Sequence, residues 1–233
     1  MGTRIWSEAE LHEVAASLEG QGPEAVLRWG FEQFGREEIA LACSFGSEDV
    51  VLVDMVSKLR PGARVFYLDT NVLFPETYTL IDQMKAKYDV SYEQVLPLLT
   101  LEEQAAQHGD ELWKSDPDAC CGIRKVEPLK RILGTVSAWI TGIRREQAPT
   151  RANAKVVEWD AKFGLVKLNP LAAWKEKDVW SYMMANGVPY NPLHDQGYPS
   201  IGCTHCTRAV KPGEDPRAGR WSGFQKTECG LHK

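Results

Sequence analysis

The sequence lacks any apolar run long enough to cross a membrane, and its N-terminal segment lacks the basic-then-apolar layout of a signal peptide. These two absences predict a cytoplasmic protein with no membrane partner. Basic residues are in deficit, because 27 Lys and Arg stand against 32 Asp and Glu and give a net charge of −5. That balance argues against nucleic acid as a partner, but it leaves room for a local basic pocket that binds a small anion.

No internal repeat and no low-complexity linker divides the 233 residues. One sizeable domain, alone or with an appendage, is therefore expected. Proline, glycine and polar residues dominate the last part of the chain, which is poor in the apolar periodicity of a packed domain. We predict a single domain over residues 1–207 and a mobile C-terminal tail over residues 208–233. The sequence does not fix the oligomeric state, and it allows a homo-oligomer.

Short apolar runs alternate with segments of helical periodicity along most of the chain. This alternation predicts an α/β fold with a mostly parallel sheet that is covered by helices on both faces. Capping boxes predict helix starts at Ser7 and Thr100, and Gly187 predicts a helix end. Strands are expected over 37–45, 64–70, 89–97 and 137–143, a hairpin over 155–160 and 164–171, and helices over 7–20, 22–35, 46–60, 75–88, 100–109 and 174–187.

A serine- and glycine-containing turn joins the first expected strand to the helix that follows it. Ligands of parallel sheets bind at the carboxyl ends of strands, and a helix N-terminus there offers backbone N–H groups to an anion. The alternative is a plain turn in which serine caps the helix. The candidate anion-binding residues are Ser44, Phe45, Gly46, Ser47, Glu48 and Asp49.

Three arginines crowd the loop after the fourth expected strand. The guanidinium fork of Arg144, Arg145 and Arg151 matches phosphate and sulfate oxygens. A solvated charge run is the usual alternative. The position of the loop after a strand favours anion binding, because the loop would then face the first candidate site.

The chain has six cysteines. Cys43 lies in an apolar run and is expected to be a buried packing residue. The adjacent pair Cys120–Cys121 and the C-x-x-C pair Cys203–Cys206 together supply four thiolates, which suit zinc or an iron–sulfur cluster. Adjacent sulfurs diverge, so a [4Fe–4S] cluster is favoured, with zinc or a redox disulfide of the second pair as alternatives. We expect His205, inside the C-x-x-C pair, to be exposed or to support the site rather than to be a ligand.

The remaining cysteine, Cys229, lies near the C-terminus on a polar segment. It is either an incidental exposed thiol or a nucleophile carried by a moving arm. Nearby cations lower the pKa of a thiol and raise its reactivity. Lys226, His232, Arg217 and Arg220 are the cations that flank it.

Six motifs in their order along the chain resemble the assimilatory adenylylsulfate (APS) reductases, within the phosphoadenylylsulfate (PAPS) reductase family. The motifs are "SFGSED", "LDTNVLFPETY", "CCGIRKVEPL", "TGIRREQAPTR", "GCTHCTR" and "ECGLH". The resemblance covers residue 42 to the end and implies a doubly wound sheet related to the adenine-nucleotide alpha hydrolases. Asn71 follows "LDT", where many relatives have glycine, and asparagine also tolerates a left-handed backbone.

The resemblance also implies roles for individual residues. Cys229 matches the catalytic cysteine, and the four paired cysteines match the ligands of a [4Fe–4S] cluster. Members with both cysteine pairs typically use APS rather than PAPS. The residues implied in substrate binding are those of the Ser44–Asp49 loop, Lys125, Arg144, Arg145, Arg151, Arg217, Arg220 and His232.

The activity implied is the reduction of APS to sulfite and AMP in sulfate assimilation for cysteine biosynthesis. Cys229 would attack the sulfate sulfur and form a thiosulfonate, which thioredoxin or a glutaredoxin-like dithiol would then cleave. The alternatives are a cluster-bearing PAPS reductase, an ATP pyrophosphatase such as a tRNA thiolase, and a non-enzymatic iron or redox sensor. "SFGSED" lacks the second glycine and the final serine of the pyrophosphatase loop.

Overall fold

The computed structural model describes residues 6–226 and 228–231, and the chain divides into two compact units. The first unit comprises Met1–Tyr67, Gln83–Glu93 and Leu133–Tyr190. The second comprises Leu68–Asp82, Gln94–Ile132 and Asn191–Lys233. Each unit is therefore assembled from separate stretches of the chain.

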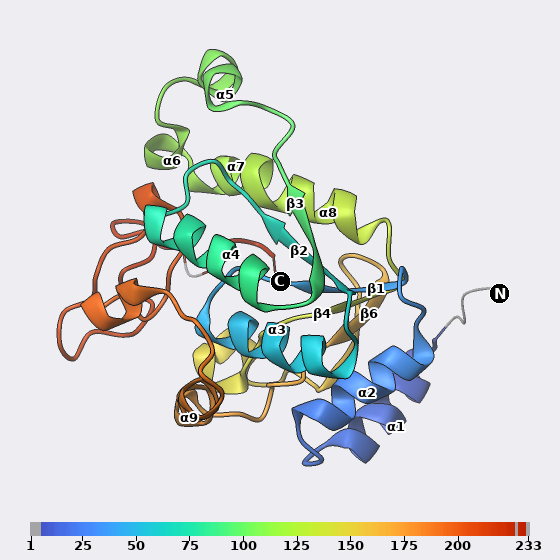
Figure 1. Ribbon diagram of the computed structural model, residues 1–233. Helices are drawn as coiled ribbons and strands as arrows, with labels where there is room; N and C mark the ends of the chain where they lie inside the picture. The colour runs from blue at the N-terminus through green and yellow to red at the C-terminus, as the bar shows by residue number, and fades with distance from the viewer. Residues whose placement is uncertain (1–5, 227, 232–233) are drawn as a thin grey trace. The chain divides into compact units, whose positions relative to one another are not determined.

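Strands and helices alternate through most of the chain, as Figure 1 shows by colour. In order they are α1 (Glu8–Leu18), α2 (Pro23–Gln33), β1 (Ile39–Ala42), α3 (Ser47–Leu59), β2 (Ala63–Leu68), α4 (Pro75–Lys87), β3 (Val90–Val95), α5 (Leu101–His108), α6 (Leu112–Ser115), α7 (Pro117–Cys121), a π-helix (Gly122–Val126), α8 (Glu127–Leu133), β4 (Ala138–Ile140), β5 (Val157–Asp160), β6 (Leu165–Leu168) and α9 (Glu176–Asn186).

The six strands form one sheet in the order β3-β2-β1-β4-β6-β5. β1 runs parallel to both of its neighbours, with Leu41 opposite Val65 of β2 and Ile140 of β4. β5 and β6 form the predicted hairpin and are the antiparallel pair at one edge. The strand order reverses between β1 and β4, so the predicted doubly wound, mostly parallel sheet is confirmed.

Continuous apolar strands explain why the middle of the sheet is buried. Leu41 and Val65 are inaccessible to solvent, and Ile140 is 1% exposed. Such strands, apolar on both faces, are typical of parallel sheets. In the first unit α1 packs on β5, α2 packs on β6, and α3 packs on β1 and α9. Figure 1 shows α3 and α9 side by side.

Helix ends follow the predicted signals. Ser7 and Glu10 form a capping box at the start of α1, and Thr100 and Glu103 form another at the start of α5. Gly187 ends α9 in the left-handed conformation, at φ +57°. Local capping chemistry therefore sets these boundaries, as expected from the sequence.

The second unit is built mainly from helices and turns. α7, the π-helix and α8 follow one another without a break, and two isolated antiparallel bridges join Leu73 to Cys203 and Thr207 to Arg220. The described residues of the predicted tail, 208–226 and 228–231, belong to this same unit as residues 94–132. The unit boundary thus does not fall at residue 207, and the mobility of the tail stays a prediction.

Within the described residues, no helix combines the length and the apolar content that a membrane crossing requires.

Candidate functional site

The loops after β1 and β4 leave the sheet where the strand order reverses. These strands are parallel neighbours, so both loops start at the same edge of the sheet. Ligands of open α/β sheets bind at this switch point, outside the carboxyl ends of the strands. The sheet therefore brings together the predicted anion loop, Ser44–Asp49, and the predicted arginine loop, residues 141–151.

A carboxylate holds the anion loop from within. The backbone N–H and the hydroxyl of Ser44 both donate to Asp49 Oδ2 at 2.6 Å. Between them, Phe45 adopts φ +60° and is 3% exposed, with its ring against Tyr67 and Tyr92. Gly46, not a serine, is the N-cap of α3, and no side chain caps this helix. The backbone N–H of Asp49 donates to the Gly46 carbonyl at 3.1 Å, so among the described residues the N–H groups of Ser47 and Glu48 are left for another acceptor.

Asp49 is buried at the first turn of α3. Burial raises the pKa of its carboxyl to about 6, the hydrogen bonds from Ser44 act to lower it, and Glu48 raises it again. Gly142, in the loop after β4, lies so close that a Cβ there would overlap Asp49 Oδ1. Glycine at position 142 is thus required by the carboxylate that holds the anion loop.

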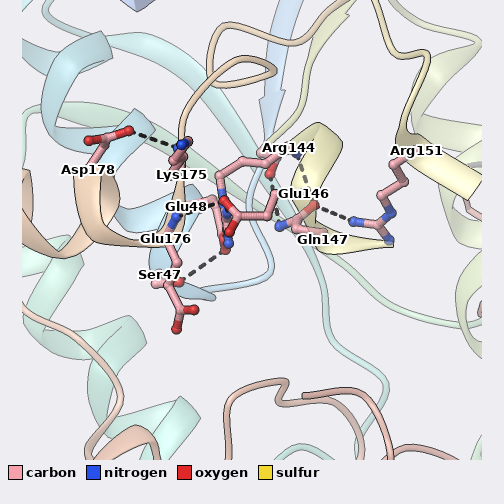
Figure 2. Close-up of polar contacts among 10 residues, drawn as sticks. Ser47, Glu48, Arg144, Glu146, Gln147, Arg151, Lys175, Glu176 and Asp178 are labelled. Carbon is pink, nitrogen blue, oxygen red and sulfur yellow. Dashed lines mark hydrogen bonds and ion pairs between the residues drawn. The ribbon is translucent and has the colours of Figure 1, made fainter. Parts of the chain in front are cut away.

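The first arginine of the loop is paired with carboxylates. The Nε of Arg144 lies 2.7 Å from Glu48 Oε1, and its Nη1 lies 3.5 Å from Glu146 Oε2. Figure 2 shows Arg144 between these two side chains, with Ser47 donating to Glu48 at 3.0 Å. The side chain of Arg144 is 8% exposed, so it links the first turn of α3 to the loop after β4.

The other two arginines differ from each other. Arg145 forms a bidentate pair with Glu19, the C-cap of α1, at 2.7 and 2.9 Å, and donates to the carbonyl of Ala154. Arg151 donates to the neutral Gln147 Oε1 at 2.6 Å (Figure 2). Arg145 therefore ties this loop to the end of α1, whereas the charge of Arg151 acts on the Asp49 carboxyl, whose pKa it lowers.

The second unit gathers the cysteines. Cys120 and Cys121 end α7 and are buried, and Cys203 and Cys206 flank a half-buried turn. Burial and the neighbouring thiols raise the pKa of Cys206 to about 11; the thiols concerned are Cys203, Cys121 and Cys120, in that order. Thiols of both sequence-distant pairs therefore act on Cys206, and their role as ligands of one group stays a prediction.

Polar side chains bind the sulfurs of this group from outside. The Thr70 hydroxyl lies 3.4 Å from Cys203 Sγ, and Gln104 Nε2 donates to Cys120 Sγ at 3.9 Å. The carbonyl of Val72 accepts from the backbone N–H of Thr204 at 2.9 Å. The "LDTN" loop after β2 is thus the support for the C-x-x-C turn.

Arg124 joins that loop to α5 and is 2% exposed. Its Nε donates to the Thr70 carbonyl at 2.6 Å, Nη1 to Gln104 Oε1 at 3.0 Å, and Nη2 to Asn71 Oδ1 at 2.9 Å. Asn71 has φ +61°, so the left-handed backbone expected at this position is confirmed. Unlike glycine, asparagine there also supplies an acceptor for the guanidinium.

Lys125 lies among the thiols, one residue after Arg124. Burial acts to lower the pKa of its ammonium, but Cys203 and Cys229, together with Cys121, outweigh burial and raise it. The cation predicted beside the cysteine group is therefore close to both of its halves and to Cys229.

The tail cations have mixed positions. Arg217 Nη2 lies 3.2 Å from Glu228 Oε2, and Lys226 pairs with Asp118. Arg220 donates to Ser200 Oγ at 3.1 Å and stacks over the Trp221 ring at 4.5 Å. Cys229 is half-buried. His232 lies outside the described residues.

The four grouped thiols are the donor set that an iron–sulfur cluster uses, and two of their sulfurs already have hydrogen-bonding neighbours. In the part of the chain that the structure describes, no three His, Cys, Asp or Glu side chains converge as ligands of one metal ion. A mononuclear zinc site requires such convergence, whereas the irons of a cluster each take one sulfur. By the chemistry of their donors the four thiols fit a cluster, and the identity of the bound group stays a prediction.

Two further expectations are confirmed. Cys43 is 2% exposed in the core, and His205 is exposed, with its ring stacked on Trp113 at a centroid distance of 4.1 Å. Sequence reasoning missed the roles of Thr70, Gln104, Arg124 and Asp118. Thr70 lies in a quoted motif and Arg124 follows the adjacent cysteines, but Gln104 had no signal beyond its helical spacing.

The chain is similar to a known protein family and to several named proteins. The model of the phosphoadenosine phosphosulfate reductase domain matches residues 38–209. A Lysinibacillus sphaericus protein named adenosine 5'-phosphosulfate reductase is 52% identical over 214 residues, which cover 91% of each chain. A protein of the same name from Salinibacter ruber is 47% identical over 97% of this chain and 90% of its own length.

Solved structures show the same fold. A phosphoadenylyl-sulfate reductase from Candida auris, in a phosphate complex, aligns with a TM-score of 0.77 and 34% identity over 89% of this chain and 100% of its own. An FMN adenylyltransferase from Candida glabrata aligns with a TM-score of 0.59 and 16% identity over 92% of this chain and 74% of its own. The second likeness concerns the fold alone.

Proposed function

This chain belongs to the phosphoadenosine phosphosulfate reductase family, and from that premise we propose that it reduces adenosine 5'-phosphosulfate to sulfite and AMP. One observation carries the proposal. The second unit groups two cysteine pairs and Cys229 around Lys125, while relatives that are about half identical over nearly their whole length are named for this activity.

The phosphate side of the nucleotide binds at the switch point of the sheet. The N–H groups of Ser47 and Glu48, in the first turn of α3, donate to the anion, because no side chain caps this helix. Arg151 places a positive charge at the anion loop, because its charge acts to lower the pKa of the Asp49 carboxyl. Arg144 and Arg145 position the loop through Glu48 and Glu19. Ser44 gives both of its donors to Asp49 and shapes the loop rather than donating to the anion.

The first chemical step transfers SO3 to the protein. The Cys229 thiolate attacks the sulfate sulfur, a sulfur–sulfur bond forms, and the bond to the AMP oxygen breaks. AMP carries away the electron pair of that bond. Lys125, which is close to Cys229, stabilises the charge on the sulfate oxygens as the bond breaks.

The second step reduces the enzyme with an external dithiol protein such as thioredoxin. One thiolate of the dithiol attacks Cys229 Sγ, and sulfite leaves with the electrons of the sulfur–sulfur bond. The second thiol of the donor then attacks the mixed disulfide, closes the donor's own disulfide and frees Cys229. Both electrons therefore come from the dithiol.

Cys120, Cys121, Cys203 and Cys206 would hold a [4Fe–4S] cluster. A bound cluster would supply a fixed charge, and no electron of this scheme would pass through it. Thr70 and Gln104 support the thiols, and Arg124 holds the loop that carries Thr70. Iron and sulfide analysis of the purified protein tests this assignment against zinc.

The decisive experiment mixes the protein with APS in the absence of any dithiol. Mass spectrometry should find one SO3 on Cys229, and reduced thioredoxin should remove it as sulfite. Cys229→Ser should form no adduct, whereas Cys43→Ala, at a buried cysteine of the core, should still form it. An adduct that persists in Cys229→Ser would overturn the assignment of the nucleophile.

PAPS reduction is the second candidate, because the solved relative from Candida auris is named for that substrate. Competition between APS and PAPS in one reaction separates the two. We expect APS to be consumed faster than PAPS, since the curated relatives at 47–52% identity are named for APS.

A further inference from the structure

Two ion pairs hold the segment that leads to Cys229. Arg217 and Glu228 pair within the segment, and the Glu228 side chain is 3% exposed. Lys226 pairs with Asp118, which lies on α7. The second pair is the one that joins the C-terminal segment to a helix far away in the sequence.

The environment of Lys226 is unusual for a lysine. Its side chain is 6% exposed, and its ammonium also donates to the carbonyl of Pro117 at 3.4 Å. It lies 5.5 Å from the centre of the Trp221 ring, which is itself buried. A desolvated ammonium needs a charged partner, so Lys226 depends on Asp118.

Asp118 contrasts with its partner, because its side chain is 81% exposed. It lies two residues before Cys120, in the helix that ends with the adjacent cysteines. Lys226 lies three residues before Cys229. The pair therefore fixes the reactive segment against the helix that carries the cysteine pair.

The residues after Cys229 confirm that the segment lies close to this helical run. A Cβ on Gly230 would lie 3.5 Å from Val126 Cγ2, at the end of the π-helix. The backbone N–H of Trp221 donates to the carbonyl of Cys206 at 3.0 Å, which anchors the other end of the segment on the C-x-x-C turn.

We propose that Asp118 and Lys226 form a latch that positions Cys229 beside the cysteine group, and that opening this latch exposes Cys229 to the donor dithiol. The proposal rests on the function proposed above, because the two half-reactions require Cys229 in two different positions. Attack on the nucleotide needs the segment docked, whereas a protein thiol must reach the thiosulfonate from solvent. The latch therefore favours the first half-reaction and opposes the second.

A double-mutant cycle measures the latch directly by hydrogen exchange, without turnover. Asp118→Asn and Lys226→Met should each raise exchange in residues 222–226 and 228–231 about threefold to tenfold, as loss of a partly buried ion pair does. The double variant should add little to either single change. Asp110→Asn and Lys211→Met, at exposed residues of the same unit, are the matched controls and should leave exchange unchanged.

The rates of the two half-reactions distinguish a latch from a merely structural ion pair, because only a latch should change them in opposite directions. Asp118→Asn should slow AMP formation in a single turnover by about threefold to tenfold, and should speed sulfite release by dithiothreitol from a preformed adduct. Raised salt screens the ion pair, so it should slow AMP formation and speed sulfite release in the wild type. The same salt should change both rates less in Asp118→Asn.

Additive exchange rates in the double variant would overturn the latch, as would half-reactions that both slow. Failure of the proposed function looks different. If Cys229→Ser still released AMP from APS, the chemistry would be wrong, whereas the exchange cycle would still report whether Asp118 and Lys226 hold the segment.

Discussion

The two candidate regions of this protein are built in different ways. The anion and arginine loops follow two neighbouring strands, so the register of the sheet places them. The cysteine region is held in position by side-chain hydrogen bonds and isolated bridges. The Arg124 side chain, for example, donates to Thr70, Asn71 and Gln104. The first region thus inherits its geometry from secondary structure, whereas the second depends on individual buried polar residues.

This difference predicts a difference in sensitivity. A side chain removed beside a sheet leaves the backbone hydrogen bonds of the strands in place. A buried guanidinium removed from a loop leaves several carbonyl and amide oxygens without donors, and each carries a desolvation cost. Removal of a buried polar side chain should therefore disturb the cysteine region more than the anion loop.

Arg124→Met tests the larger side of this difference. Loss of the buried guanidinium should lower the free energy of unfolding by about 3–5 kcal/mol, because its acceptors stay buried without donors. Urea unfolding measures the loss. Thiol reagents should also modify Cys120 and Cys203 faster, since Gln104 and Thr70 lose their anchor.

Arg131→Met is the matched control for this change. Arg131 pairs with Glu127 at 3.2 Å, and its side chain is 44% exposed. Its removal should cost less than about 1 kcal/mol. Equal losses for the two arginines would show that the cysteine region does not depend on Arg124.

Most of the fold could be predicted from the sequence because its signals are local. Alternating apolar runs gave the strands, and the capping boxes at Ser7 and Thr100 gave helix starts that the structure confirms. The helical run from Pro117 to Leu133 was not predicted, since its cysteines and its π-helix hide the usual periodicity.

The candidate sites were predictable as groups of residues but not as contacts. The cysteine spacings identified the thiols, and the position after a strand identified the arginine loop. Which arginine pairs with which carboxylate depends on tertiary neighbours: Glu19 and Glu48 lie about 100 residues or more from their partners. Gln104 beside Cys120 is likewise a contact that no local pattern encodes.

Asp49 offers a test of the anion loop through pH. Burial raises the pKa of its carboxyl from 3.8 to about 6, so the folded protein holds this proton more tightly than the unfolded chain. The associated stability is full below pH 4 and is lost as the pH rises through 6. Between pH 4.5 and 7.5, the free energy of unfolding of the wild type should fall relative to Asp49→Asn by about 2 kcal/mol.

Ser44→Ala sharpens this result. Ser44 donates to Asp49 and lowers the pKa of its carboxyl, so removing the hydroxyl should raise that pKa further. The fall in the free energy of unfolding with rising pH should then be larger in Ser44→Ala than in the wild type. Urea unfolding at several pH values measures both variants, and identical pH profiles for the wild type and Asp49→Asn would contradict the buried, proton-binding carboxyl.

Two glycines, one in each region, give the smallest and most closely matched contrast. Gly142→Ala should cost about 1–3 kcal/mol, because a Cβ there overlaps Asp49 Oδ1 and lies 2.9 Å from the Cβ of Glu48. Gly122→Ala should be neutral or stabilise by up to about 1 kcal/mol, since its φ is −55° and nothing lies within 4 Å of the added Cβ. For these glycines, the larger loss of stability is expected beside the anion loop. For the removal of a buried polar side chain such as Arg124, it is expected in the cysteine region. A tightly packed site beside a sheet is destabilised by added volume, whereas a site held by buried hydrogen bonds is destabilised by the loss of a donor. Thermal unfolding of both alanine variants decides the point, and a larger loss at Gly122 than at Gly142 would break the distinction.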